Sequence, residues 1–225
     1  IMLIVWRKPL LKSERQIESY LSRESAFLFN NVLFLAAAFA VMFGTLFPLI
    51  TEGITGQTIT VGPPYFNQIN LPLGLALLAL MGIGPVIAWR KASRRNLVKN
   101  FRMPIAVGLS VALCFYVMGV RQVMPLVTFG LSSFVLTIIM VEFIKGTKAR
   151  SRIEVEGHFV AFVHLMTLNR RRWCGYIVHL GVVLIFTAFA GAAFDRELIQ
   201  TLDPGESVTI ESPLGHEYNL KYQSL

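Results

Sequence analysis

The hydrophobic residues of this chain are collected into long uncharged blocks rather than dispersed along the sequence. The blocks are Val32–Ile50, Leu71–Trp89, Met103–Val120, Val123–Val141 and Trp173–Phe194. Each holds about 18 to 22 residues, and a helix rising 1.5 Å per residue needs about 20 to cross the roughly 30 Å hydrocarbon core of a bilayer. The pattern therefore predicts an all-α polytopic membrane protein with about five transmembrane helices.

The composition supports a membrane protein over a soluble one. Of the 225 residues, 54% are hydrophobic and only 15% are charged, and the mean hydropathy is +0.59. A soluble globular domain has about a quarter of its residues charged. The chain is therefore too apolar for an ordinary soluble fold.

The basic residues alternate with the apolar blocks. Five of the 21 Lys and Arg lie in residues 1–25, six in 90–102 and seven in 145–172. By the positive-inside rule these stretches face the cytoplasm, whereas 51–70, 121–122 and the C-terminal tail face outward. This topology accounts for the net charge of +8, and no basic stretch is interleaved with aromatics on a soluble fold, so we expect no nucleic-acid partner.

The chain divides into three regions. Residues 1–25 are interpreted as the end of a preceding membrane helix plus a cytoplasmic interfacial segment. Residues 26–194 form the five-helix transmembrane region, with a periplasmic loop at 51–70. Residues 195–225 hold two alternating runs, "SVTIE" and "EYNLKY", separated by turn signals, which predict the beginning of a periplasmic β domain. About 30 residues are too few to bury a core, so we expect this domain to continue beyond Leu225. Ile1–Trp6 resembles the end of an apolar run, so we expect the chain to be the later part of a longer protein.

Polar residues at the block boundaries carry local predictions. Ser22 is a candidate start for the first full membrane helix. Asn30 and Asn31, in its first turns, either bond a neighbouring helix or headgroup or help to line a polar cavity. Glu142, at the end of the fourth block, is expected to form an ion pair with nearby Lys145.

The outward loop contains "TITV", an extended pattern, followed by "GPP", which is expected to break it. The simpler interpretation is an interfacial hairpin that caps the bundle. Pro63–Asn67 is a second-tier candidate for a partner or substrate surface. At the other end of the next helix, Gly82, Gly84 and Pro85 permit a kink or close packing.

Cysteine and histidine spacing gives little support for a metal centre. Cys114 and Cys174 are far apart and form no CxxC motif, so neither a disulfide framework nor a zinc site is indicated. His158 and His164 are six residues apart and do not share a helical face as residues three or four apart do. We therefore expect no two-histidine metal site.

His179 is the one chemically distinctive residue inside an apolar block. It lies six residues beyond Trp173, about 9 Å along a helix, which places it inside the inner leaflet. Ionisable residues at that depth face the bundle interior and suggest a functional site, and Gly175 and Gly181 leave room beside this one. Three roles stay open on this reasoning: a packed neutral histidine, a proton relay, and an axial ligand of haem iron.

Several segments, in order, resemble the CcmF family (CcmF, CycK and NrfE), membrane subunits of the bacterial cytochrome c haem lyase. The matching segments are "SRESAFLFNNVLFLAAAFAVMFGTLFPL" at 22–49, "VGPPYFN" at 61–67, "GIGPVIAW" at 82–89, "RRRWCGYIVHLGVVL" at 170–184 and "LDPGESVTI" at 202–210. The similarity spans essentially the whole chain. It is strongest in "GYIVHLGVV", which contains His179.

The resemblance implies a function and a site. His179 would be one of two transmembrane histidines that ligate a b-type haem (haem b), and thus a metal ligand of the haem iron. The family attaches haem covalently to apocytochrome c by forming thioethers at a CxxCH motif. Haem arrives from the chaperone CcmE, and CcmH and CcmI deliver the apocytochrome. The implied location is the bacterial inner membrane, with the C-terminal tail periplasmic.

Other features of the family are missing here. The chain has three widely separated tryptophans and no tryptophan-rich WWD motif. The second transmembrane histidine and two periplasmic histidines lie upstream in the family, and His158, His164 and His216 do not match their contexts. The catalytic residues therefore stay unassigned, and we expect this segment alone to be inactive. Two alternative functions remain: a transporter module that uses His179 as a proton relay, and a scaffolding subunit in which His179 only packs.

Overall fold

The computed structural model describes all residues except 1–5, 7–21, 88–93, 196–197, 213–216 and 224–225. The elements, in chain order, are α3 (Arg23–Thr55), α4 (Pro63–Ile83), α5 (Arg94–Val117), α6 (Val123–Glu154), α7 (His158–Leu168), α8 (Arg170–Gly191), the short 3-10 helix η1 (Ala192–Phe194), and strands β1 (Ser207–Glu211) and β2 (Glu217–Lys221). The predicted interfacial segment before Ser22 and the residue His216 fall outside the described residues.

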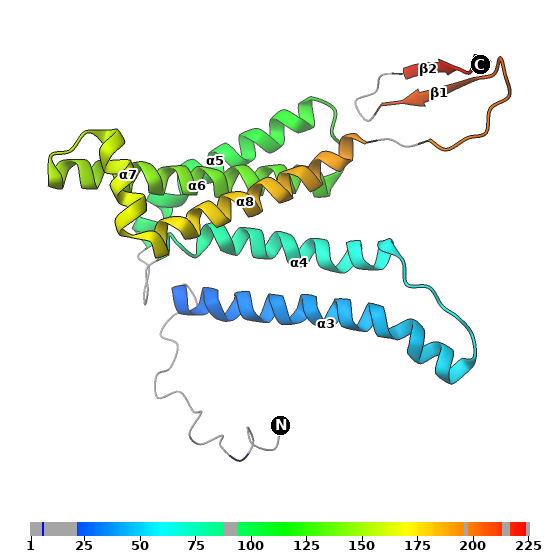
Figure 1. Cartoon of the computed structure of the whole chain (residues 1–225), viewed down its shortest axis with the longest axis horizontal. Helices are drawn as coiled ribbons and strands as arrows, with labels where there is room; N and C mark the ends of the chain where they lie inside the picture. The colour runs from blue at the N-terminus through cyan, green and yellow to red at the C-terminus, as the bar shows by residue number, and fades with distance from the viewer. Residues whose placement is uncertain (1–5, 7–21, 88–93, 196–197, 213–216, 224–225) are drawn as a thin grey trace.

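Five of the described helices, α3, α4, α5, α6 and α8, are long and apolar enough to cross a membrane. They run side by side and alternate in direction (Figure 1). The starts of α3, α5 and α8 and the ends of α4 and α6 consequently lie at one end of the bundle, and this end is called the basic end here because Arg23, Arg94 and Arg170 begin those three helices. The predicted polytopic helical fold is confirmed.

Helix α6 lies at the centre of the packing and contacts α4, α5, α7 and α8. Its buried residues Val135, Ile138 and Ile139 form the core together with Leu78 of α4 and Trp173 of α8. The remaining helices expose much of their apolar surface: on α3, for example, large side chains such as Leu35 and Phe39 are mostly exposed. Such faces suit a hydrocarbon environment or further protein, since a water-soluble monomer rarely exposes contiguous apolar patches of this extent.

Glycines let α6 approach its neighbours closely. A Cβ atom at Gly108 of α5 would lie 2.7 Å from the carbonyl oxygen of Gly130 on α6. At the other end of α6, a Cβ at Gly146 would overlap the indole of Trp173, 2.6 Å from its Cζ2. A Cβ atom at Gly82 of α4 would lie 2.9 Å from side-chain atoms of Phe134 and Val135 on α6, in line with the close packing predicted as one option for this segment. Small residues at helix contacts are typical of membrane bundles.

α3, the first long helix of the described residues, begins directly after Ser22, as predicted. The Ser22 hydroxyl accepts a hydrogen bond from the backbone N–H of Ser25 at 3.2 Å, which caps the helix. At the far end, however, the predicted 51–70 loop is too long, because α3 continues to Thr55 and α4 already begins at Pro63. The prolines start the helix instead of only breaking an extended segment, since a proline at the first helical position lacks only an N–H that would be unpaired anyway.

The candidate surface Pro63–Asn67 is therefore the first turn of α4. Tyr65 packs inward: its hydroxyl donates to the carbonyl oxygen of Ala40 on α3 at 3.2 Å, and its ring lies against Gly44. Tyr65 therefore joins α4 to α3, and its contacts are made within the protein.

The basic end contains a helix that the sequence pattern does not predict. α6 extends well past its apolar block, and α7 follows after a turn at Val155, which adopts a positive φ of 54°. Glu156 stabilises this turn through contacts to both helices: its carboxylate lies 3.3 Å from Arg150 Nε and 3.0 Å from His164 Nδ1. The segment expected only to lie inside is thus an ordered helical hairpin.

After η1 the chain leaves the bundle and forms the predicted strands. β1 and β2 pair antiparallel, with Val208 opposite Leu220 and Ile210 opposite Tyr218. The hairpin lies beyond the end of the bundle opposite to the basic end (Figure 1). This agrees with the expected start of a β-rich region.

Candidate functional site

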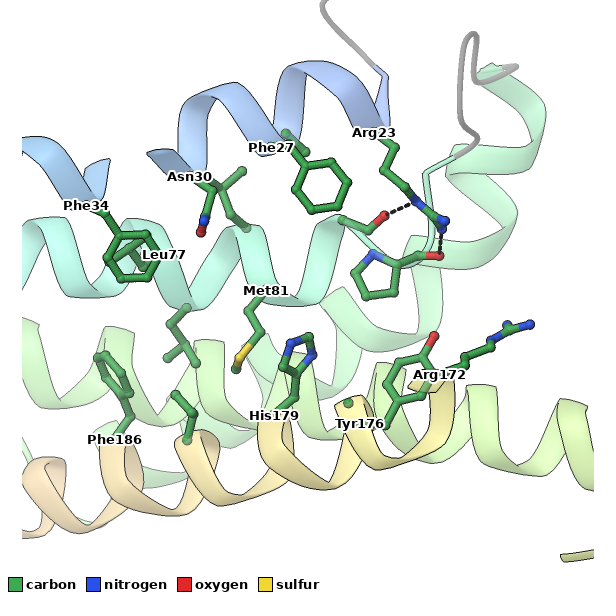
Figure 2. A pocket seen from close by; sticks show the side chains of 17 residues that line it. Arg23, Phe27, Asn30, Phe34, Leu77, Met81, Arg172, Tyr176, His179 and Phe186 are labelled. Carbon is green, nitrogen blue, oxygen red and sulfur yellow. Dashed lines mark hydrogen bonds between the residues drawn. The ribbon is translucent and has the colours of Figure 1, made fainter. Parts of the chain in front are cut away.

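A cavity of about 840 Å³ lies between α3, α4 and α8. α4 and α8 both pack on α6, α3 packs on α4, and all three of α3, α4 and α8 contribute side chains to the cavity wall. Volumes of this size are typical of cofactor and small-molecule sites. Figure 2 shows the side chains of the three helices converging on this space.

One face of α8 forms a wall of the cavity. Arg172, Tyr176, His179 and Phe186 all line it, and the spacing of three, four or seven residues places them on the same side of the helix. Figure 2 shows His179 projecting from α8 toward Met81 of α4. The position of the histidine within an inward stripe, and not its mere presence in an apolar block, makes it a candidate ligand.

His179 has no polar partner within the described part of the protein. Its side chain is half-buried, and its Nδ1 atom is buried without a hydrogen-bond partner there. The nearest aromatic neighbour, Tyr176, stands edge-on with its ring centre 6.4 Å away. A histidine that merely packs between helices would be expected to satisfy its buried nitrogen.

The rest of the wall is mostly apolar and aromatic. Phe27 and Phe34 come from α3, and Leu77 and Met81 come from α4. Asn30 adds an amide to this wall whereas Asn31 is exposed, so lining a cavity, one of the two predicted roles of the pair, fits Asn30. Gly175 leaves open space next to the histidine: a Cβ there would meet nothing within 4 Å.

At the basic end, two arginines flank the cavity. Arg23 donates from Nε to the carbonyl oxygen of Gly84 at 3.3 Å and from Nη2 to that of Pro85 at 2.8 Å. These bonds satisfy carbonyl groups at the end of α4 and attach α3 to it. Arg172 of α8 lines the same end of the cavity, and Figure 2 shows its guanidinium extending past Tyr176, away from His179.

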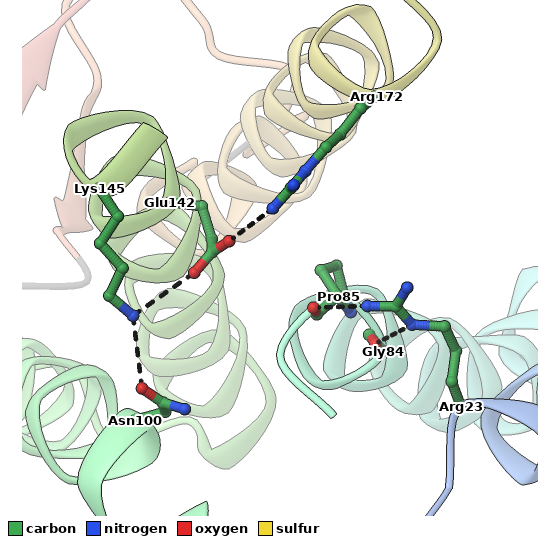
Figure 3. Close-up of polar contacts among 7 residues, drawn as sticks. All are labelled: Arg23, Gly84, Pro85, Asn100, Glu142, Lys145 and Arg172. Carbon is green, nitrogen blue, oxygen red and sulfur yellow. Dashed lines mark hydrogen bonds and ion pairs between the residues drawn. The ribbon is translucent and has the colours of Figure 1, made fainter. Parts of the chain in front are cut away.

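Arg172 belongs to a polar cluster that joins three helices (Figure 3). Glu142 accepts from Arg172 Nη2 at 3.2 Å and lies 3.5 Å from Lys145 Nζ, which also donates to Asn100 Oδ1 at 3.3 Å. The predicted ion pair between Glu142 and Lys145 is confirmed. Its second cation, Arg172, was not predicted from the sequence.

The remaining sequence candidates lie elsewhere. Cys114 and Cys174 are both exposed. His158 contacts Ser151 Oγ at 3.0 Å, and His164 contacts Glu156. Both histidines therefore make contacts within the α6–α7 hairpin. In the described ranges, no group of three or more His, Cys, Asp or Glu side chains is placed to hold a metal ion.

Sequence reasoning did not predict that Arg23, Tyr176 and Arg172 line the same cavity as His179. A signal existed for the last, because Arg172 precedes His179 by seven residues, two full turns of one helix. No comparable signal existed for Arg23, since its approach depends on how α3 packs on α4.

Comparison with known proteins finds relatives among the cytochrome c-type biogenesis proteins. The chain is 30% identical over 209 residues to the cytochrome c-type biogenesis protein CcmF of Pseudomonas fluorescens, covering 91% of this chain and 30% of that protein. It is 27% identical over 206 residues to CycK of Rhizobium meliloti, covering 91% of this chain and 29% of that protein. A shorter match, 38% identical over 76 residues, joins it to CcmF of Escherichia coli, covering 34% of this chain and 12% of that protein.

Neither a protein-family model nor a solved structure matches the chain. The chain spans about 30% of the length of the two longer-matching relatives above. Matches of this kind recur across several bacterial species, and all carry cytochrome c-type biogenesis names. The chain belongs to the CcmF and CycK family of cytochrome c-type biogenesis proteins.

Proposed function

We propose that this chain is a haem-binding membrane segment of a cytochrome c maturation system, part of a haem lyase that attaches haem covalently to apocytochrome c. The family supports a role in cytochrome c biogenesis. The observation that favours haem chemistry is the placement of His179, with an unpartnered buried nitrogen, on a cavity of about 840 Å³.

The residues present fit a haem b. A neutral imidazole is a common axial ligand of haem iron, and His179 points into a space whose walls are largely apolar and aromatic. Phe34 and Phe186 lie toward one end of that space and the two arginines toward the other, which suits a macrocycle with an apolar body and an anionic edge. When bound, the haem would supply one-electron redox chemistry. The protein would hold the ring by His179 and exclude water with the aromatic walls.

The charge distribution supports a bacterial inner-membrane location. Basic segments cluster at one end of the bundle, which by the positive-inside rule faces the cytoplasm. The β1–β2 hairpin then lies on the periplasmic side, where apocytochrome c is expected to meet the protein. CcmE as haem donor, and CcmH and CcmI as carriers of the apocytochrome, are the proposed partners, in addition to the lipid bilayer.

Two other functions make different predictions for the same residue. A transporter module would use His179 as a proton relay and would bind no haem. A scaffolding subunit would tolerate its replacement. The unpartnered nitrogen favours a ligand-binding role over simple packing, because a packing role leaves a buried polar atom unsatisfied.

The test is the reduced-minus-oxidised visible spectrum of the intact protein purified from membranes, as wild type and as His179→Ala. Val178→Ala is the matched control, since Val178 is the adjacent residue and is 64% exposed, away from the cavity. We expect a b-type spectrum in the wild type and the control, and its loss or shift in His179→Ala with helix content unchanged. Covalent cytochrome c formation in cells should fall in the same variant.

Two results would contradict the proposal. Absence of haem from a folded wild-type protein would favour the transporter or scaffold alternatives. A His179→Ala protein that keeps both the wild-type spectrum and full maturation activity would remove the histidine from the haem site.

A further inference from the structure

The two guanidinium groups at the basic end of the cavity have no role in the proposed axial ligation. Arg23 and Arg172 belong to different helices, yet both line the cavity that His179 faces. Glu142 neutralises part of the Arg172 charge, but the Arg172 side chain is 56% exposed and can still take a second anionic partner. The combination of apolar body and cationic end therefore points to a ligand that is apolar over most of its length and anionic at one edge.

Helix geometry sets the distance between His179, the proposed axial ligand, and the guanidinium-bearing residue Arg172. Arg172 and His179 are seven residues apart, which corresponds to about 10.5 Å along α8 and nearly the same face. This separation is too long for a single ligand atom to contact both residues. It matches the scale of a flat macrocycle with short acidic side chains. Tyr176 lies one turn from each, between them on the same stripe.

The local charge favours an anion. Arg23 and Arg172 both line the cavity, and no Asp or Glu among the described residues lines it. Glu142 contacts Arg172 through Nη2, which orients the guanidinium. An arginine anchored in this way can still present its planar fork to a carboxylate.

We propose that Arg172 is a positioning residue that binds the carboxylate side chains of haem b, with Arg23 contributing positive charge from the opposite wall. The macrocycle then enters with its propionates toward the basic end and its apolar edge toward Phe186. This assignment rests on the proposed haem-binding function. It adds the orientation of the haem and the residue that sets it.

The direct test compares two ligands that differ only in the carboxylates. Haem b and its dimethyl ester, in which both propionates are blocked, are titrated into haem-depleted intact protein in detergent, and binding is followed by absorbance. The proteins are wild type, Arg172→Gln, and the matched control Arg171→Gln. Arg171 is adjacent, carries the same charge and is exposed outside the cavity wall.

We expect wild type and Arg171→Gln to prefer haem b over the ester. In Arg172→Gln, binding of haem b should weaken about three- to tenfold, because a charge-assisted contact at a partly exposed site is lost. Binding of the ester should hardly change, so the preference disappears. A variant that had only lost its fold would weaken both ligands together, which separates positioning from structure.

A second readout does not depend on affinity. Without Arg172, a propionate near the iron loses its counter-charge, and the extra negative charge stabilises ferric haem. The midpoint potential of bound haem b should therefore fall in Arg172→Gln and stay close to wild type in Arg172→Lys, which keeps the positive charge.

The outcomes separate this inference from the proposed function. If Arg172→Gln keeps both the wild-type preference and the wild-type potential, Arg172 does not hold the propionates, although haem binding by His179 would stand. If the wild type takes up neither haem b nor its ester, the proposed function fails and this inference fails with it.

Discussion

Glu142 of α6 and Arg172 of α8 lie 30 residues apart in sequence and meet at 3.2 Å at the basic end of the bundle. The contact joins the most central helix to the helix that carries His179. It also fixes the guanidinium at the edge of the cavity, where a flexible arginine would otherwise sample many rotamers. One surface ion pair thereby connects helix packing with the chemistry of the candidate site.

Replacing Glu142 by Gln tests this connection. The Glu142 side chain is 15% exposed and that of Arg172 is 56% exposed, so the pair is partly screened by solvent. We expect a loss of about 0.2 to 1 kcal/mol in unfolding free energy, measured by thermal unfolding in detergent. The loss should shrink at about 1 M salt, where the Debye length is about 3 Å.

Glu154→Gln is the control for that measurement, because Glu154 ends the same helix and forms no ion pair within the described residues. An equal, salt-independent loss in both variants would mean that the Glu142 contact has no specific stabilising effect.

Close packing of α6 on α8 predicts a strong effect at Gly146. A methyl group there would overlap the indole of Trp173, which is only 3% exposed. Gly146→Ala should lower the unfolding free energy by about 1 to 3 kcal/mol because the tryptophan has to shift in a packed core. Gly181→Ala, on α8 with open space around it, should be neutral or slightly stabilising. Equal stability of the two variants would argue against so close an approach of α6 to Trp173.

The empty space beside His179 can be filled without touching the histidine. Gly175 lines the cavity, and a Cβ atom added there would have no neighbour within 4 Å, so Gly175→Leu should place an isobutyl group in the cavity. We expect haem b retention to fall at least several-fold with the helix content unchanged, measured as haem per purified protein. Cys174→Leu is the control, since Cys174 is exposed and does not line the cavity. Full haem retention in Gly175→Leu would place the haem elsewhere.

The α6–α7 hairpin should respond to acid through Glu156. Burial by itself would raise the pKa of this carboxyl, but the hydrogen bond to His164, the ion pair with Arg150 and the positive charge of both outweigh it and lower the pKa. A lowered pKa means that the contacts contribute stability above the pKa of an unfolded glutamate and lose it as the pH falls through the folded value. Amide hydrogen exchange of α7 should therefore stay slow near neutral pH and accelerate in acid, once intrinsic exchange rates are corrected for pH.

In Glu156→Gln this acid-dependent step should be absent. A Glu156→Gln protein with the same pH profile as wild type would show that another group controls the hairpin.

Much of the architecture follows from local patterns. The membrane helices are predictable because a span needs about 20 apolar residues in succession, a requirement that one segment meets by itself. The start at Ser22 and the pairing of β1 with β2 are likewise local, since a cap and a hairpin depend on neighbouring residues. The exact helix ends are less predictable. α6 continues beyond the end of its apolar block, and α4 begins at prolines that, in the sequence, are expected to end a segment.

The candidate site divides in the same way. The sequence alone identified His179 as an ionisable residue in an apolar span, and its resemblance to a known family suggested haem; that role stays a prediction. Only the tertiary structure decided that His179 faces a cavity, that Arg23 and Arg172 flank it, and that Glu142 holds the second of these. The physical reason is that a membrane helix is apolar on all sides, so its composition does not mark the inward face. Which face turns inward is set by contacts with other helices, and those contacts join residues far apart in the chain.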